Sequence, residues 1–329
     1  MNILFIFGNG FDKAQGMHTS YPEFYEYLNS KKDELSVPFQ ELLNEINSNN
    51  ELWSDMEEAF GKYTSKIQNA QEFENLYFDI CDNLQDYLEI QEENFNPSEE
   101  LRKKFESDLC HIEEYLMGGD QERYISFKNE WVGDQQIRVM TFNYTDTFEK
   151  LLSLGSDTSK IIKSNVFLQD VVHVHGKLGN TIILGVDNER QIGKKEFHNN
   201  QDVTDLLVKE QSNIAIGVLR HIRCEELISN ANVIVLYGVS LGETDARWRK
   251  YIGYQFFNRT DLCIIQHIYK NDMISPRRLQ KIKQLKRIQI ERWKKMMDIN
   301  DEEWSDDYEE RLFLFTKPNL FTLKEESKG

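Results

Sequence analysis

The stretch Asn2–Phe7, with the sequence NILFIF, runs directly into the glycine-containing turn GNGFDKAQG at residues 8–16. A short, almost wholly apolar run that ends at a glycine is typical of a strand buried on both faces, as in a parallel sheet covered by helices. A glycine turn that opens a helix after such a strand can also receive a phosphate group. We therefore expect an α/β protein whose ligand site begins at Gly8.

Further apolar runs of similar length follow along the chain. They are IRVMTF at 137–142, VVHVH at 171–175, TIILGV at 181–186, NVIVLYG at 232–238 and LCIIQHIY at 262–269. Helical patterns separate several of these runs: TDTFEKLL at 145–152 with Thr145 as its cap, a long stretch over 203–227, and TDARWRKYIGYQF at 244–256. Alternation of strands and helices predicts a doubly wound, mostly parallel, Rossmann-like sheet.

Between the first two strands lie about 120 residues with helical periodicity and no strand pattern, which predicts a large helical insertion. After Ser275-Pro276 a basic amphipathic helix is expected to run to about Met297, and RLFLFTKPNLFTL at 311–323 to add an edge strand. The predicted divisions are a nucleotide-binding core over 1–38 and 132–270, the insertion over 39–131, and a C-terminal helix and edge segment over 271–329.

The composition excludes several classes of function. Asp and Glu total 56 residues and Lys and Arg 39, a formal charge of −17, which disfavours a nucleic-acid surface. The basic residues between Arg277 and Arg287 are read as a solvated helix face. The four cysteines have no C-x-x-C pair and suit a reducing compartment. No apolar run approaches the roughly 20 residues of a membrane span, so we expect a cytoplasmic protein without membrane contact.

Residues that directly follow the predicted strands are mostly small or polar. They are Gly8–Asp12, Asn143–Asp146, His175–Gly176 and Gly238–Leu241. In an open parallel sheet, ligands bind at the carboxyl ends of the strands, where the strand order reverses. These four segments are therefore predicted to form one site.

The first of these segments allows two interpretations. Gly8 and Gly10 suit a close approach of backbone to phosphate, but the next glycine is Gly16, so the spacing differs from G-x-G-x-x-G and a plain tight turn explains it equally. Asp12 is placed either to contact a ribose hydroxyl or to cap a helix.

His175 is the strongest candidate for chemistry, because an imidazole titrates near working pH and can take a proton from water or a sugar hydroxyl. A hydrogen-bonded structural histidine is the alternative. His173, two residues earlier, is either its neighbour or a core residue. Asn143 is placed to orient a ribose or a water, or else to cap a helix, and Ser240 to contact phosphate or ribose, or else to form a turn.

Two kinds of catalytic site are disfavoured. The chain has no G-x-S-x-G motif and no cysteine at a predicted strand end, which argues against nucleophilic catalysis. His173 and His175 lack a third ligand at a recognisable spacing, so no metal is predicted.

Together these segments resemble the AbiH family of bacteriophage abortive-infection proteins. The resemblance rests on FIFGNGFDKAQGMHTSY at 5–21, ELWSDMEEAF at 51–60, TFNYTDTFEKL at 141–151, VVHVHGKLGN with IILGVDN after it, and VIVLYGVSLGETD at 233–245. These blocks cover residues 1 to about 270.

A more distant resemblance is to the sirtuin fold. GNG stands where sirtuins have G-A-G, TFN where they have T-Q-N, His175-Gly176 where they have the catalytic His-Gly, and Gly238–Leu241 where they have G-T-S-L. This resemblance implies NAD as substrate or ligand, with Asn143 and His175 catalytic. The cofactor-binding residues that it implies are Gly8, Asn9, Gly10, Phe11, Asp12, Thr141, Asp146, Gly238, Ser240 and Leu241.

The chain also departs from the sirtuin pattern. It lacks the paired C-x-x-C zinc module, and Phe142 replaces glutamine, so a peptide deacylase is not expected. The resemblance implies instead an antiphage effector that binds and hydrolyses NAD or a related nucleotide. The alternative is a non-catalytic nucleotide-binding sensor or toxin component of a defence system. A homo-oligomer or a defence-system partner protein is compatible with either function.

Overall fold

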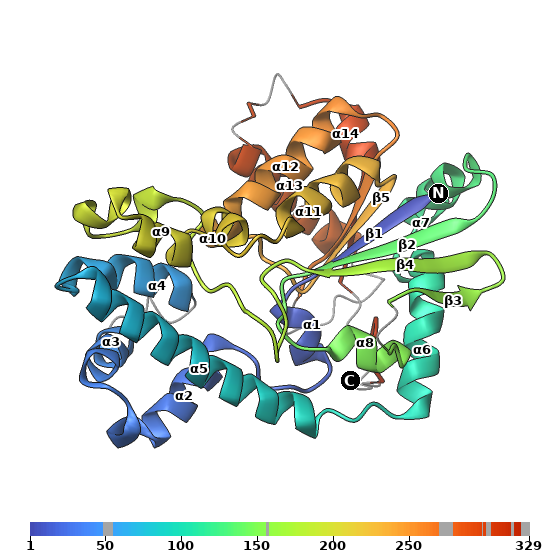
Figure 1. Cartoon of the computed structure of the whole chain (residues 1–329). Coiled ribbons are helices and arrows are strands. Elements are labelled where there is room, and N and C mark those ends of the chain that lie inside the picture. The colour runs from blue at the N-terminus through green and yellow to red at the C-terminus, as the bar shows by residue number, and fades with distance from the viewer. Residues whose placement is uncertain are drawn as a thin grey trace.

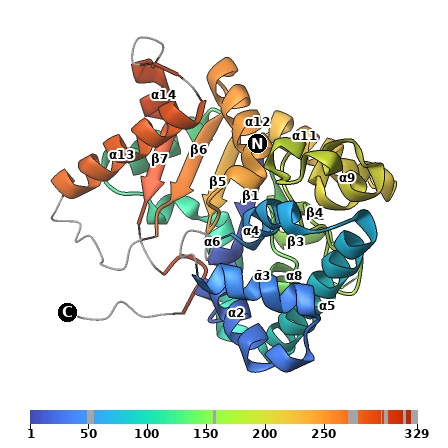
Figure 2. The same ribbon diagram turned by 90° about the vertical axis from the view of Figure 1, so that its left-hand side faces the viewer.

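The computed structural model describes residues 1–48, 55–155, 158–269, 279–297, 299–300, 304–316 and 319–323. Its centre is a seven-stranded, mostly parallel sheet with the order β3-β4-β2-β1-β5-β6-β7, of which Figure 1 shows β1 to β5 and Figure 2 shows β6 and β7. The strands are β1 Asn2–Phe7, β2 Gln135–Thr141, β3 Lys160–Lys163, β4 Val166–His173, β5 Val233–Tyr237, β6 Cys263–His267 and β7 Leu312–Phe315. Only β3 is antiparallel to its neighbour. The mixed α/β class predicted from the sequence is therefore confirmed.

Helices cover both faces of the sheet, as the apolar character of β1 requires. Side chains alternate along a strand, so Ile3, Phe5 and Phe7 pack on one face while Leu4 and Ile6 pack on the other. The first face is covered by α1 Asn9–Ala14, α6 Glu99–Cys110, α7 Gly119–Asn129 and α8 Thr147–Leu152. The second is covered by α11 Arg220–Asn230, α12 Ala246–Asn258, α13 Leu279–Met297 and α14 Asp306–Arg311.

A separate group of helices lies beyond the carboxyl ends of the strands and is grouped together in Figure 2. It consists of α2 Tyr21–Ser30, α3 Val37–Ser48, α4 Met56–Tyr63 and α5 Ala70–Asn94. These helices share one apolar cluster with the segment 178–208, which includes α9 Gln201–Leu207. We call α2–α5 the helical layer. The predicted division of the chain into its three parts stays a prediction.

One sequence expectation about secondary structure was wrong. The run at 181–186 forms no strand apart from a single bridge between Val186 and Val208, because its apolar side chains are buried against the helical layer instead of pairing with the sheet. The helical pattern predicted over 203–227 is confirmed, and the structure divides it among α9, α10 Lys209–Ala215 and α11. The chain leaves α10 at Gly217, whose φ of +70° favours glycine.

The expectations for the C-terminal part of the chain agree with the structure where its residues are described. The helix α13 ends at Met297 as predicted, whereas its expected start at Ser275-Pro276 lies outside the described residues. The edge strand is β7, which pairs only with β6. No helix in the described ranges is both long and apolar enough to cross a membrane.

Candidate functional site

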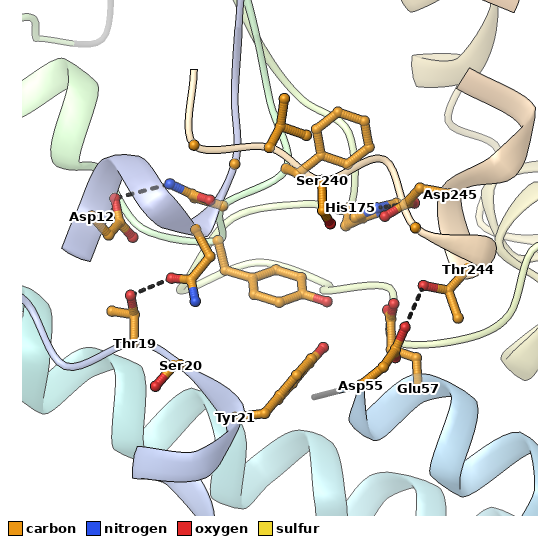
Figure 3. Close-up of a pocket in the computed structure, with 18 of the residues that line it drawn as sticks. Asp12, Thr19, Ser20, Tyr21, Asp55, Glu57, His175, Ser240, Thr244 and Asp245 are labelled. Atoms are coloured by element: carbon orange, nitrogen blue, oxygen red, sulfur yellow. Dashed lines mark hydrogen bonds and ion pairs between the residues drawn. The ribbon is translucent and has the colours of Figure 1, made fainter. Parts of the chain in front are cut away.

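A cavity of about 320 Å³ lies between the carboxyl edge of the sheet and the helical layer (Figure 3). From the sheet side it is lined by Gly8, Asn9, Asp12, Phe142, Asn143, Tyr144, Thr145, His175, Gly238, Val239, Ser240, Leu241, Gly242, Thr244 and Asp245. From the opposite side it is lined by Thr19, Ser20, Tyr21, Pro22, Asp55, Glu57, Leu84 and Leu88. The segments that follow β1, β2, β4 and β5 therefore line one cavity, and their role as a ligand site stays a prediction.

Eight of the twelve predicted site residues line this cavity. They are Gly8, Asn9, Asp12, Asn143, His175, Gly238, Ser240 and Leu241. The other four lie behind it. Phe11 is buried in the core against Phe7, Thr141 accepts a hydrogen bond from the backbone of Asn143, and Asp146 pairs with Lys177.

The fourth residue behind the cavity, Gly10, explains why the first turn contains glycine. A Cβ on Gly10 would lie 2.6 Å from the Cα of Gly238, and Gly238 itself has a φ of +66°. The amide of Gly10 donates to the carbonyl of Gly238 at 2.9 Å, and the amide of Gly8 donates to the carbonyl of Tyr237 at 3.2 Å. Close contact between the turns after β1 and β5 thus accounts for these glycines, and their amides are already paired.

Asp12 forms the centre of a buried polar network on one side of the cavity. Its carboxylate accepts hydrogen bonds from Asn143 Nδ2 at 2.9 Å and from Thr145 Oγ1 at 2.6 Å. Burial raises the pKa of Asp12 to about 6, although these hydrogen bonds and His173 oppose the rise. The side-chain nitrogen Nδ2 of Asn143 is therefore held by Asp12, which leaves the side-chain oxygen Oδ1 to accept a hydrogen bond from a ligand in the cavity.

The helix caps expected at this site are not formed by the expected side chains. Gly8, not Asp12, is the N-cap of α1. Asp146, not Thr145, is the N-cap of α8, and Asn143 lies outside both helices. Asp12 and Thr145 do not cap because their side chains bond to each other at the cavity.

A second polar network, on the other side of the cavity, contains His175. His175 Nε2 lies 3.0 Å from Asp245 Oδ1, and the same carboxylate oxygen accepts a hydrogen bond from Lys209 Nζ at 2.9 Å. Lys209 Nζ also donates to Glu57 Oε2 at 2.8 Å. Glu57 belongs to α4, Lys209 to α10 and Asp245 to a 3-10 turn before α12, so this network joins three separate parts of the fold.

Burial and charge determine the protonation of this second network. Desolvation lowers the pKa of His175, and the positive charge of Lys209 lowers it further. Lys209 and His175 together hold the pKa of Asp245 well below its usual range, despite burial. Burial raises the pKa of Glu57 to about 7. His175 is therefore neutral at neutral pH and faces an ionised Asp245.

The hydrogen-bond partner of His175 fixes its tautomer. Because an ionised carboxylate only accepts hydrogen bonds, the proton of neutral His175 resides on Nε2 and the lone pair on Nδ1. Nδ1 is buried and has no partner among the described residues. The ring of Phe142 packs against the imidazole edge, with ring centroids 5.4 Å apart. His175 thus has a free basic nitrogen in a fixed orientation.

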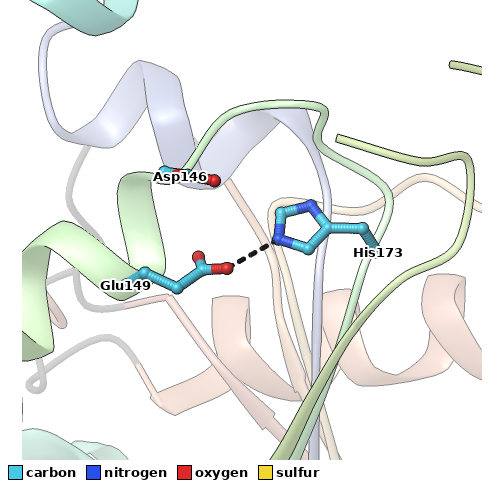
Figure 4. Close-up of side chains that lie close together, drawn as sticks. All are labelled: Asp146, Glu149 and His173. Atoms are coloured by element: carbon cyan, nitrogen blue, oxygen red, sulfur yellow. Dashed lines mark hydrogen bonds and ion pairs between the residues drawn. The ribbon is translucent and has the colours of Figure 1, made fainter. Parts of the chain in front are cut away.

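His173 belongs to a different cluster from His175 (Figure 4). Its Nδ1 lies 2.9 Å from the carbonyl oxygen of Asn143, and its Nε2 lies 2.8 Å from Glu149 Oε1. Both partners are acceptors, so both ring nitrogens donate and the imidazole is protonated. Burial lowers the pKa of His173, but the hydrogen bond and the charge of Glu149 outweigh burial and raise it.

Asp146, Glu149 and His173 also have the composition of a metal site. Their ligand atoms lie within 4.8 Å of one another. However, Lys177 Nζ lies 2.7 Å from Asp146 and 3.5 Å from Glu149. Lys177 and protonated His173 balance the charge of the two carboxylates, so we interpret this group as an ion-pair cluster that supports the backbone of Asn143.

Sequence reasoning missed the partners of His175. Asp245 and Glu57 lie in two of the segments that resemble the AbiH family, VIVLYGVSLGETD and ELWSDMEEAF. Neither was predicted to be a site residue. Lys209 gave no signal, because it is one of several charged residues in a helical stretch. Its contact with Glu57 spans 152 positions in the sequence.

One comparison with known proteins agrees with the resemblance to the AbiH family. Comparison with curated proteins found no match. A family model described as bacteriophage abortive infection AbiH matches residues 4–266, which include every segment that lines the cavity. The chain therefore belongs to the AbiH family of bacteriophage abortive-infection proteins.

Proposed function

We propose that the protein is a cytoplasmic antiphage effector that binds NAD or a related nucleotide in this cavity and hydrolyses its N-glycosidic bond. The observation that carries the proposal is the convergence of two oriented side chains, His175 held by Asp245 and Asn143 held by Asp12, on one cavity at the carboxyl edge of the sheet. Loss of this cofactor from an infected cell would account for abortive infection.

The strand order supports a nucleotide as the ligand. Without the antiparallel strand β3, the remaining strands in chain order have the sheet order 3-2-1-4-5-6, which is that of doubly wound dinucleotide-binding sheets. In such sheets the ligand lies where the strand order reverses, and here the turns after β1, β2 and β5 line the cavity. A volume of about 320 Å³ is within the range of small-molecule sites.

The charges around the cavity suit a transition state that carries positive charge on the ribose. Four carboxylates, those of Asp12, Asp55, Glu57 and Asp245, line the cavity, and no Lys or Arg does so within the described residues. Cleavage of the bond between ribose and nicotinamide passes through a transition state with positive charge on the ribose. Fixed negative charge such as that of Asp245 stabilises this charge in a site with little water.

His175 supplies the proton acceptor in this proposal. The oxygen of a water molecule bonds to the ribose carbon, the bond from this carbon to the ring nitrogen breaks, and the ring takes the electron pair and leaves as neutral nicotinamide. The proton of the water passes to Nδ1 of His175, and the resulting imidazolium is stabilised by Asp245. The side-chain oxygen Oδ1 of Asn143 accepts a hydrogen bond from the water or from a ribose hydroxyl and so orients it.

The test is release of nicotinamide from NAD by purified protein, measured by chromatography alongside binding of NAD by calorimetry. We expect turnover with the wild type and none above background with His175→Ala or Asn143→Ala, whereas both variants retain the fold. Mass spectrometry of nucleotides that co-purify with Asn143→Ala identifies the substrate. Turnover that is equal in the wild type and in His175→Ala would refute the assignment.

A nucleotide-binding sensor without turnover is the second candidate. The observation in its favour is the burial of His175, of which only 5% is exposed, with no accessible surface on Nδ1. A ligand that binds without reaching this nitrogen would be held but not cleaved. NAD or ADP-ribose binding in the wild type without release of nicotinamide, unchanged by His175→Ala, would support this candidate over hydrolysis.

A further inference from the structure

We propose that Lys209 is the positioning residue of the site: it holds Asp245 in place, keeps His175 neutral with a free Nδ1, and anchors both to helix α4 through Glu57. The consequence for turnover rests on the proposed hydrolysis. The consequence for the protonation of His175 does not, and it is measured separately.

The hydrogen bonds of Lys209 carry the first step of the argument. Only 7% of Lys209 is exposed, and its ammonium group has three protons. These meet three acceptors: Glu57 Oε2 at 2.8 Å, Asp245 Oδ1 at 2.9 Å and the carbonyl oxygen of Thr244 at 3.0 Å. A buried lysine with every donor engaged has one orientation, so it fixes the two carboxylates and the turn at Thr244 relative to one another.

The second step concerns the oxygen that Lys209 shares with His175. Asp245 Oδ1 accepts from both Lys209 Nζ and His175 Nε2. If Asp245 stood opposite His175 alone, a buried histidine and carboxylate would favour an imidazolium–carboxylate pair, and Nδ1 would carry a proton. The positive charge of Lys209 satisfies Asp245 instead and opposes a second positive charge on His175.

The other charged groups around His175 do not replace Lys209. Arg220 on α11 adds a smaller effect of the same sign, and Asp245 acts in the opposite direction. A second, small cavity that is also lined by His175 has the ionisable residues Asp187, Lys209, Glu210, His221, Asp245 and Arg247 in its wall. Arg247 pairs with Glu210 and Glu225. Lys209 is therefore the cation that contacts the His175–Asp245 pair directly.

The third step is the link to the helical layer. Glu57 lies in the first turn of α4, and Glu57 Oε1 also accepts the amide of Gly185 at 3.1 Å. Asp55, the N-cap of α4, accepts a hydrogen bond from Thr244 Oγ1 at 3.0 Å. The start of α4 is thus bonded twice to the segment that holds Asp245, once through Lys209 and once through Thr244.

The experiment measures the pKa of His175 by NMR on protein labelled at its histidines, with His175→Gln used to assign the signal. In Lys209→Met we expect this pKa to rise, because a neighbouring positive charge is lost. In Asp245→Asn we expect it to fall, because a negative charge is lost. Lys209→Arg keeps the charge and should keep the wild-type pKa. Lys177→Met, two positions after His175 but bonded to Asp146, is the matched control and should leave it unchanged.

Turnover supplies the second readout. For each unit by which the pKa of His175 rises above the assay pH, its neutral fraction falls about tenfold. Lys209→Met should therefore lose about tenfold or more of its NAD hydrolysis near pH 6.5 and regain part of it as the pH is raised. If Lys209→Met fails to fold, the double variant Glu57→Gln, Lys209→Met is used in its stead. This variant lacks one of the two carboxylates that the loss of Lys209 leaves unpaired.

The outcomes are separable. A pKa of His175 that stays the same or falls in Lys209→Met and in the double variant overturns the proposal, whatever the activity. A rise of that pKa in protein that releases no nicotinamide supports the role of Lys209 and refutes the proposed hydrolysis.

Discussion

Two histidines that lie two residues apart have opposite electrostatic environments. His173, at the end of β4, is bonded to Glu149 and to the carbonyl oxygen of Asn143, and its pKa is raised. His175 is buried beside Lys209 and Asp245, and its pKa is lowered. The sequence Val-His-Val-His gives no sign of this difference. Protonation state is set by partners from distant parts of the chain, so the same residue type is a protonated ion-pair partner at one position and a neutral imidazole two positions later.

The largest expected effect is on turnover. His175→Gln should lower NAD hydrolysis by about 10²–10⁴-fold, the usual contribution of a general base. His173→Gln should lower it by less than about tenfold, since it acts only through the backbone of Asn143. Release of nicotinamide under saturating NAD measures both. Equal losses in the two variants would show that the two histidines do not have separate roles.

The next effect is on stability and compares two lysines. Lys209→Met leaves Glu57 and Asp245 buried without their cation, which should cost about 3–5 kcal/mol of unfolding free energy. Lys177→Met removes a cation whose side chain is 35% exposed, and it should cost less than about 1 kcal/mol. Denaturant unfolding of both variants near neutral pH measures the difference. A cost below about 1 kcal/mol for Lys209→Met would mean that its carboxylates find other partners or become protonated.

A third effect concerns Asp12, on the His173 side of the cavity. Its folded pKa of about 6 exceeds its ordinary value of 3.8, so its contribution to stability is fully present below pH 3.8 and is lost as the pH rises through about 6. A difference of about two between these pKa values corresponds to about 3 kcal/mol. Raising the pH from 4 to 7 should therefore lower the unfolding free energy of the wild type by up to about 3 kcal/mol more than it lowers that of Asp12→Asn. Parallel pH profiles for the two proteins would contradict the raised pKa.

The parts of this site that could be predicted from the sequence are those set by strand ends. Asn143 and His175 directly follow apolar runs, and parallel strands place their carboxyl ends at one edge, so their meeting at a cavity follows from local pattern alone. The strand predicted at 181–186 was wrong for a related reason. An apolar run is buried either in a sheet or against helices, and periodicity does not distinguish the two.

The remaining parts depend on long-range contacts. Glu57, Lys209 and Asp245 lie on three different elements, and no spacing in the sequence connects them. For the glycines of the first turn the sequence suggests either close approach to a phosphate or a plain tight turn, whereas in the structure they allow close approach to the turn after β5. Gly10 faces the backbone of Gly238, a contact that only the pairing of β1 with β5 reveals.

The smallest effect tests the opposite signs of the two histidines directly. His173 has a raised pKa, so its stabilisation is present below pH 6.5 and is lost as the pH rises through its folded pKa. His175 has a lowered pKa, so stability is lost as the pH falls below 6.5, because the unfolded chain takes up a proton that the folded protein does not. Each unit of pKa difference corresponds to about 1.4 kcal/mol. On acidification from pH 8 to 5, His173→Gln should lose stability relative to the wild type, whereas His175→Gln should gain it. Denaturant unfolding at pH 5, 6.5 and 8 measures both slopes, and slopes of the same sign would mean that the two environments are not opposed.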